Sequence, residues 1–150
     1  MVIEIKSFDT LSNDELYAIL KLRQEIFVVE QNCAYLDCDD KDQKSHHLML
    51  KENNQLVAYT RLMPIGLSYK DHASIGRVVT KASHRGKNLG YKIMKASVEA
   101  IKKLFPNQNI KISAQVYTLE FYKKIGFEKI GAEYLEDGIP HQAMIYTYGD

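Results

Sequence analysis

The spacing of hydrophobic and polar residues changes repeatedly along the chain, and each change predicts a new element. Alternating or short apolar runs predict strands at residues 2–6, 46–51, 55–64, 73–80 and 110–115, with one or two more between 127 and 148. Apolar residues at three- and four-residue intervals predict helices at 13–29, at 118–125, and from residue 89 to the proline at 106. This order predicts an α/β or α+β domain, with helices packed on a single layer of sheet.

Short local signals support two of these boundaries and mark one position inside a strand. Ser12 and Glu15 have the spacing of a capping box at the start of the first helix. The pair Asn53-Asn54 between two strands is typical of a hairpin turn. Gly76 lies inside a predicted strand, where a glycine indicates a β-bulge or the close approach of a ligand or backbone.

The length of 150 residues predicts one domain over 1–150, and the content of 45% apolar and 26% charged residues is that of a soluble globular protein. A net charge of +1 disfavours a nucleic acid as the main partner. No apolar run is long enough for a membrane span, and the first residues lack a basic segment followed by an apolar one, so we expect a cytoplasmic protein. Cys33 and Cys38 are expected to be free thiols, and no metal site is predicted.

A basic, glycine-containing loop between a predicted strand and a predicted helix, residues 81–90, carries the strongest chemical signal. Between residues 77 and 103 there are eight lysines and arginines and one acid, Glu99. Unpaired N–H groups at a helix start attract anions, and glycine lets the backbone approach them closely, which favours a pyrophosphate site. The alternative is an ordinary strand-to-helix turn beside a solvated basic helix face.

A tyrosine, Tyr122, follows the strand 110–115 on the next predicted helix, near the open edge of the sheet. Taken alone it is better explained as a core or surface aromatic residue. Together, two motifs resemble the acetyl-CoA core of the GNAT superfamily of N-acetyltransferases: Arg85-Gly86-x-x-Leu89-Gly90, and further along Phe121-Tyr122-x-x-x-Gly126-Phe127. The resemblance implies the GNAT acyl-CoA N-acyltransferase fold, a central mixed and mostly antiparallel sheet with helices on both faces.

Other segments resemble the ElaA-like branch of this superfamily more narrowly. They are Leu22-Arg23-Gln24-x-Ile26-Phe27-Val28-Val29-Glu30-Gln31-x-Cys33, Ile75-Gly76-Arg77-Val78, Ala114-Gln115 and Glu136-Asp137-Gly138-Ile139-Pro140-His141. The resemblance implies transfer of an acetyl group from acetyl-CoA to a primary amine of a small molecule or peptide, by direct attack on the thioester. A homodimer is a further expectation.

The resemblance also implies which residues hold acetyl-CoA. The backbone of Val78, Val79 and Thr80 would pair with the pantetheine, and Gln115 would contact it. The pyrophosphate would be held by Arg85, Gly86, Lys87, Asn88, Leu89, Gly90 and Tyr91. Tyr122 would protonate the leaving thiolate, a role for which a donor held at the sulfur is chemically suited.

Two departures from the family pattern bear on these expectations. Asn88 replaces the usual glycine at the fourth loop position, and asparagine tolerates a positive φ better than other non-glycine residues. The strand 73–80 lacks the glutamate that many members use as the general base. The candidates for the base are therefore Glu30, His47 and His141, each of which has a purely structural alternative.

Charged residues near the N-terminal end leave further alternatives open. Arg23 lies on the apolar stripe of the first helix and needs a partner, either in a structural ion pair or in the acceptor pocket. The acids between residues 30 and 42 form either a solvated loop or a surface that attracts a cationic amine. For the whole chain, the alternatives to an N-acetyltransferase are a non-catalytic CoA-binding or interaction module and, less favoured, a protein that resembles acyl-homoserine lactone synthases.

Overall fold

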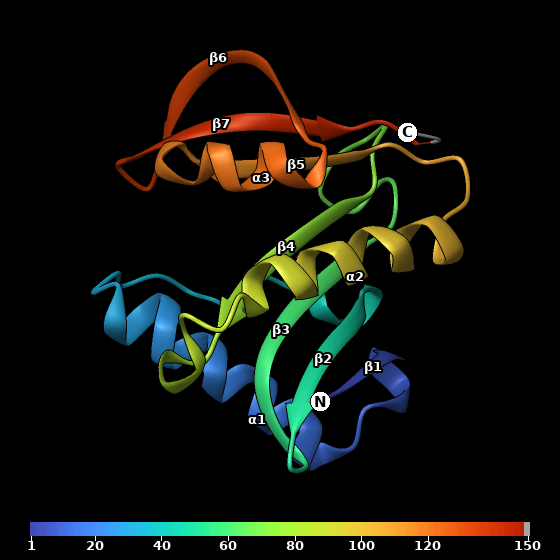
Figure 1. The fold of residues 1–150 in the computed structure, drawn as a ribbon, viewed down its shortest axis with the longest axis vertical. Coiled ribbons are helices and arrows are strands. Elements are labelled where there is room, and N and C mark those ends of the chain that lie inside the picture. Colours follow the sequence, from blue (N-terminus) through green and yellow to red (C-terminus); the bar gives the residue numbers. More distant parts are fainter. Residues whose placement is uncertain (149–150) are drawn as a thin grey trace.

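The computed structural model describes residues 1–148 and contains seven strands and three α-helices (Figure 1). The strands are β1 (Val2–Ser7), β2 (His46–Glu52), β3 (Gln55–Met63), β4 (Ser74–Thr80), β5 (Ile110–Gln115), β6 (Glu128–Glu136) and β7 (Ile139–Tyr146). The helices are α1 (Asn13–Arg23), α2 (Leu89–Leu104) and α3 (Leu119–Ile125). None of the helices in the described chain is both long and apolar enough to cross a bilayer.

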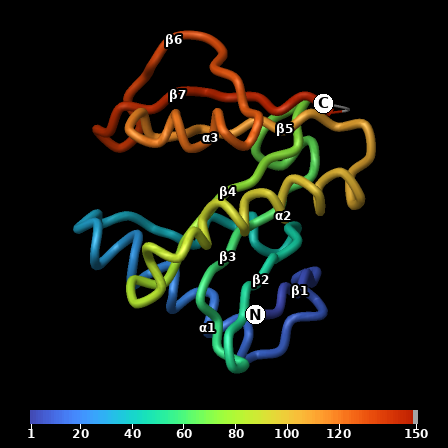
Figure 2. The backbone as a smooth tube through the Cα atoms, viewed as in Figure 1, coloured from blue at the N-terminus to red at the C-terminus, as the bar shows by residue number. Residues whose placement is uncertain are grey.

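The strands form two antiparallel sheets in place of the single layer that the sequence predicts. The first has the order β1-β2-β3-β4 and the second the order β5-β7-β6. They meet where β4 and β5 begin, at a parallel bridge between Ala73 and Ile110, and the second sheet then lies apart from the far end of β4 (Figure 2). The predicted fold class, a mixed and mostly antiparallel sheet with helices, is confirmed.

A β-bulge in β4 accompanies this divergence. Tyr59 on β3 pairs with Val79, but Arg61 pairs with Gly76, so β4 holds one extra residue. Within this bulge the backbone of Arg77 adopts a positive φ of +51°. A Cβ on Gly76 would lie 3.0 Å from the Met63 side chain. The bulge predicted from Gly76 is therefore present, and because it turns the backbone of β4 out of its ladder, it leaves room between the two sheets.

Helices cover both faces of the first sheet. Helix α2 packs Ile93, Met94 and Ile101 against the larger core cluster, which includes Leu48 and Leu62 of the sheet. Helix α1 packs a smaller cluster on the other face, made of Ile19, Leu22, Ile26, Met49, Tyr59 and Val79. Since apolar residues line both faces, the strands β2 and β3 are buried almost throughout.

The first predicted helix, 13–29, is α-helical only to Arg23. It begins with the predicted capping box, in which the Ser12 hydroxyl accepts from the Glu15 N–H at 3.0 Å. Residues Gln24–Glu30 then form a π-helical segment, η2. Over two turns the spacing of apolar residues does not distinguish α from π winding, so the sequence pattern misses the change. The wider turn carries Phe27 and Gln31 to the edge of the cavity described below.

Candidate active site

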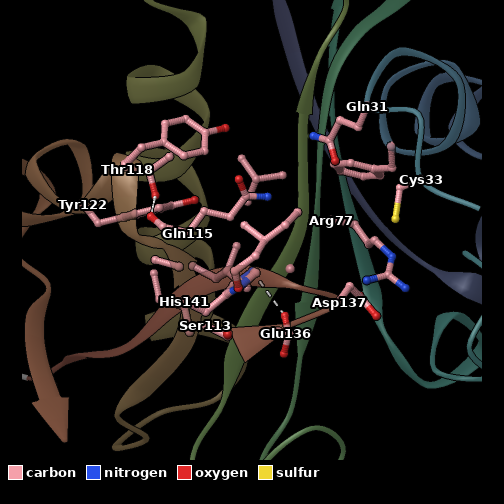
Figure 3. A pocket seen from close by; sticks show the side chains of 18 of the residues that line it. Gln31, Cys33, Arg77, Ser113, Gln115, Thr118, Tyr122, Glu136, Asp137 and His141 are labelled. Atoms are coloured by element: carbon pink, nitrogen blue, oxygen red, sulfur yellow. Dashed lines mark hydrogen bonds and ion pairs between the residues drawn. The ribbon is translucent and has the colours of Figure 1, made fainter. Parts of the chain in front are cut away.

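A cavity of about 300 Å³ lies where β4 and β5 diverge (Figure 3). Its walls come from five places that are distant in the sequence: the end of η2 and the segment after it, the bulge of β4, the end of β5, the start of α3, and the turn between β6 and β7. The side chains relevant to chemistry are Arg77, Gln115, Tyr122, Glu136, Asp137 and His141. The divergence of the sheets thus creates one pocket from the edges of both.

The hydroxyl of Tyr122 points into this cavity beside Gln115 (Figure 3). Its ring packs edge-on against Phe121 and Phe127, with ring centroids 5.0 and 5.9 Å away. Burial raises the pKa of Tyr122 to about 12, with a smaller contribution from Tyr117. The hydroxyl is therefore protonated at neutral pH and can act as a proton donor within the cavity.

A second hollow, of about 420 Å³, lies at the start of α2. It gathers most of the residues that the resemblance implicates in pyrophosphate binding, together with Thr80 at the end of β4: Arg85, Gly86, Asn88, Leu89, Gly90 and Tyr91. Lys87 belongs to the same exposed loop but does not line the hollow. Gly86 has φ +82° and Asn88 has φ +60°, so the asparagine adopts the left-handed conformation that it tolerates better than other non-glycine residues.

Strand β4 connects the two hollows. Val78 lines the cavity and Thr80 lines the hollow at α2. The side chain of Val79 between them is buried in the cluster against α1, so only its backbone faces outward. An extended ligand could run along β4 from the basic loop to Tyr122 by pairing with this backbone, as an added strand does.

The three candidate bases are placed very differently. Glu30 lies at the end of η2, and its carboxylate is 2.6 Å from Nη1 of Arg85, with both side chains nearly half exposed. It therefore stands at the basic loop and does not line the cavity.

His47 lies on strand β2 of the first sheet and is fully buried. Its Nε2 is 2.9 Å from the carbonyl oxygen of Asp42 and its Nδ1 is 2.6 Å from the Tyr59 hydroxyl. Because a carbonyl only accepts, Nε2 carries the proton and Nδ1 accepts from Tyr59. Burial lowers the pKa of His47. Both ring nitrogens of His47 are engaged in hydrogen bonds, and the residue does not line the cavity. This placement favours a structural role for His47 over the role of general base.

His141 does line the cavity, together with Tyr122. It is 6% exposed, and the register of β5 with β7 places it directly opposite Gln115. Its Nδ1 donates to the carbonyl oxygen of Ile139 at 2.7 Å, and its Nε2 lies 3.3 Å from Oε2 of Glu136. Of the three candidates, the structure brings only His141 together with Tyr122.

A buried network of charges supports the wall opposite His141. Arg23, fully buried, binds Asp37 and Asp42, each at 2.8 Å. Arg61 binds Asp42 at 2.9 Å and Asp39 at 2.8 Å. Burial alone would raise the pKa of Asp42, but hydrogen bonds from Arg23 and Arg61 outweigh it and hold that pKa below its usual value. Arg23 thus has the partner it requires.

Three of the five acids between residues 30 and 42 belong to neither a solvated loop nor a free anionic surface, whereas Glu30 and Asp40 are exposed. Asp37, Asp39 and Asp42 neutralise arginines inside the protein. Arg77, on the strand β4 that lacks an acid, joins them through its guanidinium, which lies 2.9 Å from Asp37 and 3.3 Å from Asp39. This network therefore ties the segment to both α1 and the bulge of β4.

Sequence reasoning did not single out Glu136 as a functional residue. The signal that could have found it is the pair Asp137-Gly138, whose φ angles of +52° and +75° form a two-residue hairpin turn. This turn pairs Glu136 with Ile139 and leaves His141 opposite Tyr134. Among the residues that the structure describes, no group of three or more His, Cys, Asp or Glu could hold a metal ion.

Comparison with known proteins places this architecture in a family. The sequence profile of the acetyltransferase (GNAT) domain matches residues 16–148. UPF0039 protein sll0451 of Synechocystis sp. is 43% identical over 140 residues, which cover 93% of this chain and 90% of that protein.

Two solved structures are similar over nearly their whole length. An acyl-CoA N-acyltransferase from Pseudomonas aeruginosa has a TM-score of 0.91 and 37% identity, covering 98% of this chain and 100% of that one. Escherichia coli ElaA has a TM-score of 0.89 and 34% identity, covering 97% of this chain and 99% of that one. The chain therefore belongs to the GNAT acetyltransferase family and, within it, to the ElaA-like branch. Membership implies acyltransferase activity.

The acyl-homoserine lactone synthases share the fold only. BjaI, a CoA-dependent member of that group, has a TM-score of 0.81 but 19% identity. At this identity the likeness carries no argument about the reaction.

Proposed function

We propose that the protein is an N-acetyltransferase that transfers an acetyl group from acetyl-CoA to a primary amine by direct attack on the thioester. The observation that carries this proposal is the alignment of three features along β4: the basic loop, the outward backbone of residues 78–80, and the buried hydroxyl of Tyr122. An extended thioester with an anionic end matches this order.

Each end of the donor has a group suited to it. The loop of residues 85–91 offers backbone N–H groups and Arg85 to a pyrophosphate. Gln115 lies beside Tyr122, where the pantetheine would end (Figure 3). When the amine attacks, the C–N bond forms and the C–S bond breaks, and the thiolate takes the proton of Tyr122.

The second proton belongs to the amine. An alkylamine is an ammonium ion at neutral pH and attacks only after losing a proton. His141 is the base we assign to this step, because it alone of the candidates lines the cavity with Tyr122. The amide nitrogen then gives its remaining extra proton to the tyrosinate, directly or through water, which restores Tyr122.

A thiol-release assay with acetyl-CoA over a panel of alkylamines, polyamines and peptides tests the proposal, with acetyl-CoA binding measured in parallel. We expect release with at least one amine. Binding of acetyl-CoA without release across the panel would favour the non-catalytic CoA-binding module, for which the missing acid on β4 is the argument. Absence of binding would contradict the assignment of the loop.

A further inference from the structure

In the contact between His141 and Glu136, two hydrogen-bond acceptors face each other when the imidazole is neutral. Nδ1 of His141 faces a carbonyl oxygen, which can only accept, so the hydrogen of the neutral ring is on Nδ1. Nε2 then presents a lone pair to the carboxylate of Glu136 at 3.3 Å. Two acceptors at this distance are stable only when a proton lies between them, and either a ligand donor or protonation of Nε2 itself supplies it.

The geometry of the ring is fixed by its surroundings. His141 is buried, held by the Ile139 carbonyl, and stacked on Tyr134 with ring centroids 6.2 Å apart. Glu136, by contrast, is half exposed at the mouth of the cavity. Both residues line the cavity (Figure 3): Nε2 of His141 is a fixed, buried acceptor, and the Glu136 carboxylate is a charged, half-exposed one.

The charge balance of the cavity favours a cation at this position. Among the described residues that line it, Arg77 is the only lysine or arginine, and Asp37 and Asp39 already neutralise its guanidinium. Glu136 and Asp137, at the turn between β6 and β7, remain as carboxylates in the lining. The aromatic rings of Phe27, Tyr35 and Tyr117 line the rest, and aromatic faces also attract cations.

We propose that Glu136 and His141 together form the binding site for the ammonium group of the acceptor, which restricts the acceptor to amines that are protonated at neutral pH. An alkylammonium has three N–H donors, so one can bind Nε2 of His141 and another the carboxylate of Glu136. This inference deepens the function proposed above and rests on it for the transfer step.

The same contact accounts for the removal of the proton. The N–H bond that points at Nε2 breaks, the proton forms the Nε2–H bond, and the imidazolium pairs with the Glu136 carboxylate. The neutral amine keeps its electron pair for the thioester carbon. Arylamines and alcohols, which are neutral at this pH, gain nothing from the carboxylate and are expected to be poor acceptors.

The experiment measures binding without turnover, by calorimetry on protein loaded with CoA instead of acetyl-CoA. The probes are two ammonium–alcohol pairs of matched shape, phenethylamine with 2-phenylethanol and 1,4-diaminobutane with 1,4-butanediol. We expect at least one amine to bind about tenfold or more tightly than its alcohol, the range of a charge-assisted hydrogen bond. Glu136→Gln should abolish this preference, whereas Glu133→Gln, an exposed acid on the same strand, should keep it.

The outcomes separate this inference from the proposed function. Equal binding of amine and alcohol in both pairs, or a preference that survives in Glu136→Gln, would overturn the ammonium site even if acetyl transfer occurs. A preference that depends on Glu136, without thiol release from acetyl-CoA, would support the site and contradict the transferase.

Discussion

The proposed donor half and the proposed acceptor half of the site are built in different ways. The donor half is one continuous stretch, from the bulge of β4 through the loop to the start of α2, and it offers mainly backbone groups. The acceptor half is assembled from side chains of η2 and the β6–β7 hairpin, which meet Gln115 of β5 and Tyr122 of α3 only because the two sheets diverge. A backbone site leaves a contiguous motif in the sequence, whereas a side-chain site does not.

Substitution of Tyr122, the proposed proton donor where the two halves meet, should have the largest effect on turnover. Tyr122→Phe removes only the hydroxyl, so we expect kcat to fall by about 10²- to 10⁴-fold while CoA affinity stays nearly unchanged. Tyr17→Phe, on the exposed face of α1, is the matched control and should behave as wild type. Steady-state kinetics and calorimetry measure the two quantities, and equal turnover of both variants would remove Tyr122 from the reaction.

Loss of Arg23 from the buried charge network should have a large effect on the free energy of unfolding. Arg23→Met leaves Asp37 and Asp42 buried without their shared partner, so we expect the free energy of unfolding to fall by about 3–5 kcal/mol. Urea denaturation measures it, with Lys21→Met as the control, since Lys21 is exposed on the same helix. A loss below about 1 kcal/mol would mean that the segment 30–42 is held in place by other contacts.

The sequence predicts more of the donor half than of the acceptor half, because the donor half is contiguous in the chain and the acceptor half is not. Residues 85–90 form one contiguous basic, glycine-containing loop, which favours an anion site, and the family resemblance points to the same residues; Asn88 adopts the positive φ that its residue type allows. The need of Arg23 for a partner was also predictable, but not which of five nearby acids would meet it. The division into two sheets, the π-helical turn and the pairing of Glu136 with His141 depend on long-range packing and register, which hydrophobic periodicity does not encode.

A carboxylate in the basic loop should weaken the donor half alone. Gly86→Glu places a side chain on a residue with φ +82° and a negative charge beside the proposed pyrophosphate site. Strain of about 1–2 kcal/mol plus charge repulsion predicts CoA binding weaker by about tenfold or more.

The matched control for this loop is Gly66→Glu, because Gly66 has a similar φ of +89° and equally open surroundings in a different loop. It should lose comparable stability and keep its CoA affinity. If both variants lose CoA affinity equally, strain explains the effect and the loop has no specific role in binding the pyrophosphate.

The smallest expected effect tests whether the two halves are connected. Glu30 at the end of η2 holds Arg85 of the loop at 2.6 Å, so a pyrophosphate that binds Arg85 must compete with this carboxylate. The pair is largely exposed, and such pairs contribute up to about 1 kcal/mol. Glu30→Gln should therefore tighten CoA binding by up to about fivefold, and the gain should shrink at high salt.

Glu25→Gln removes an exposed acid from the same segment and should not alter affinity. Weaker CoA binding in Glu30→Gln would instead mean that Glu30 orients Arg85 for the ligand, so that the acceptor side assists the donor side instead of competing with it.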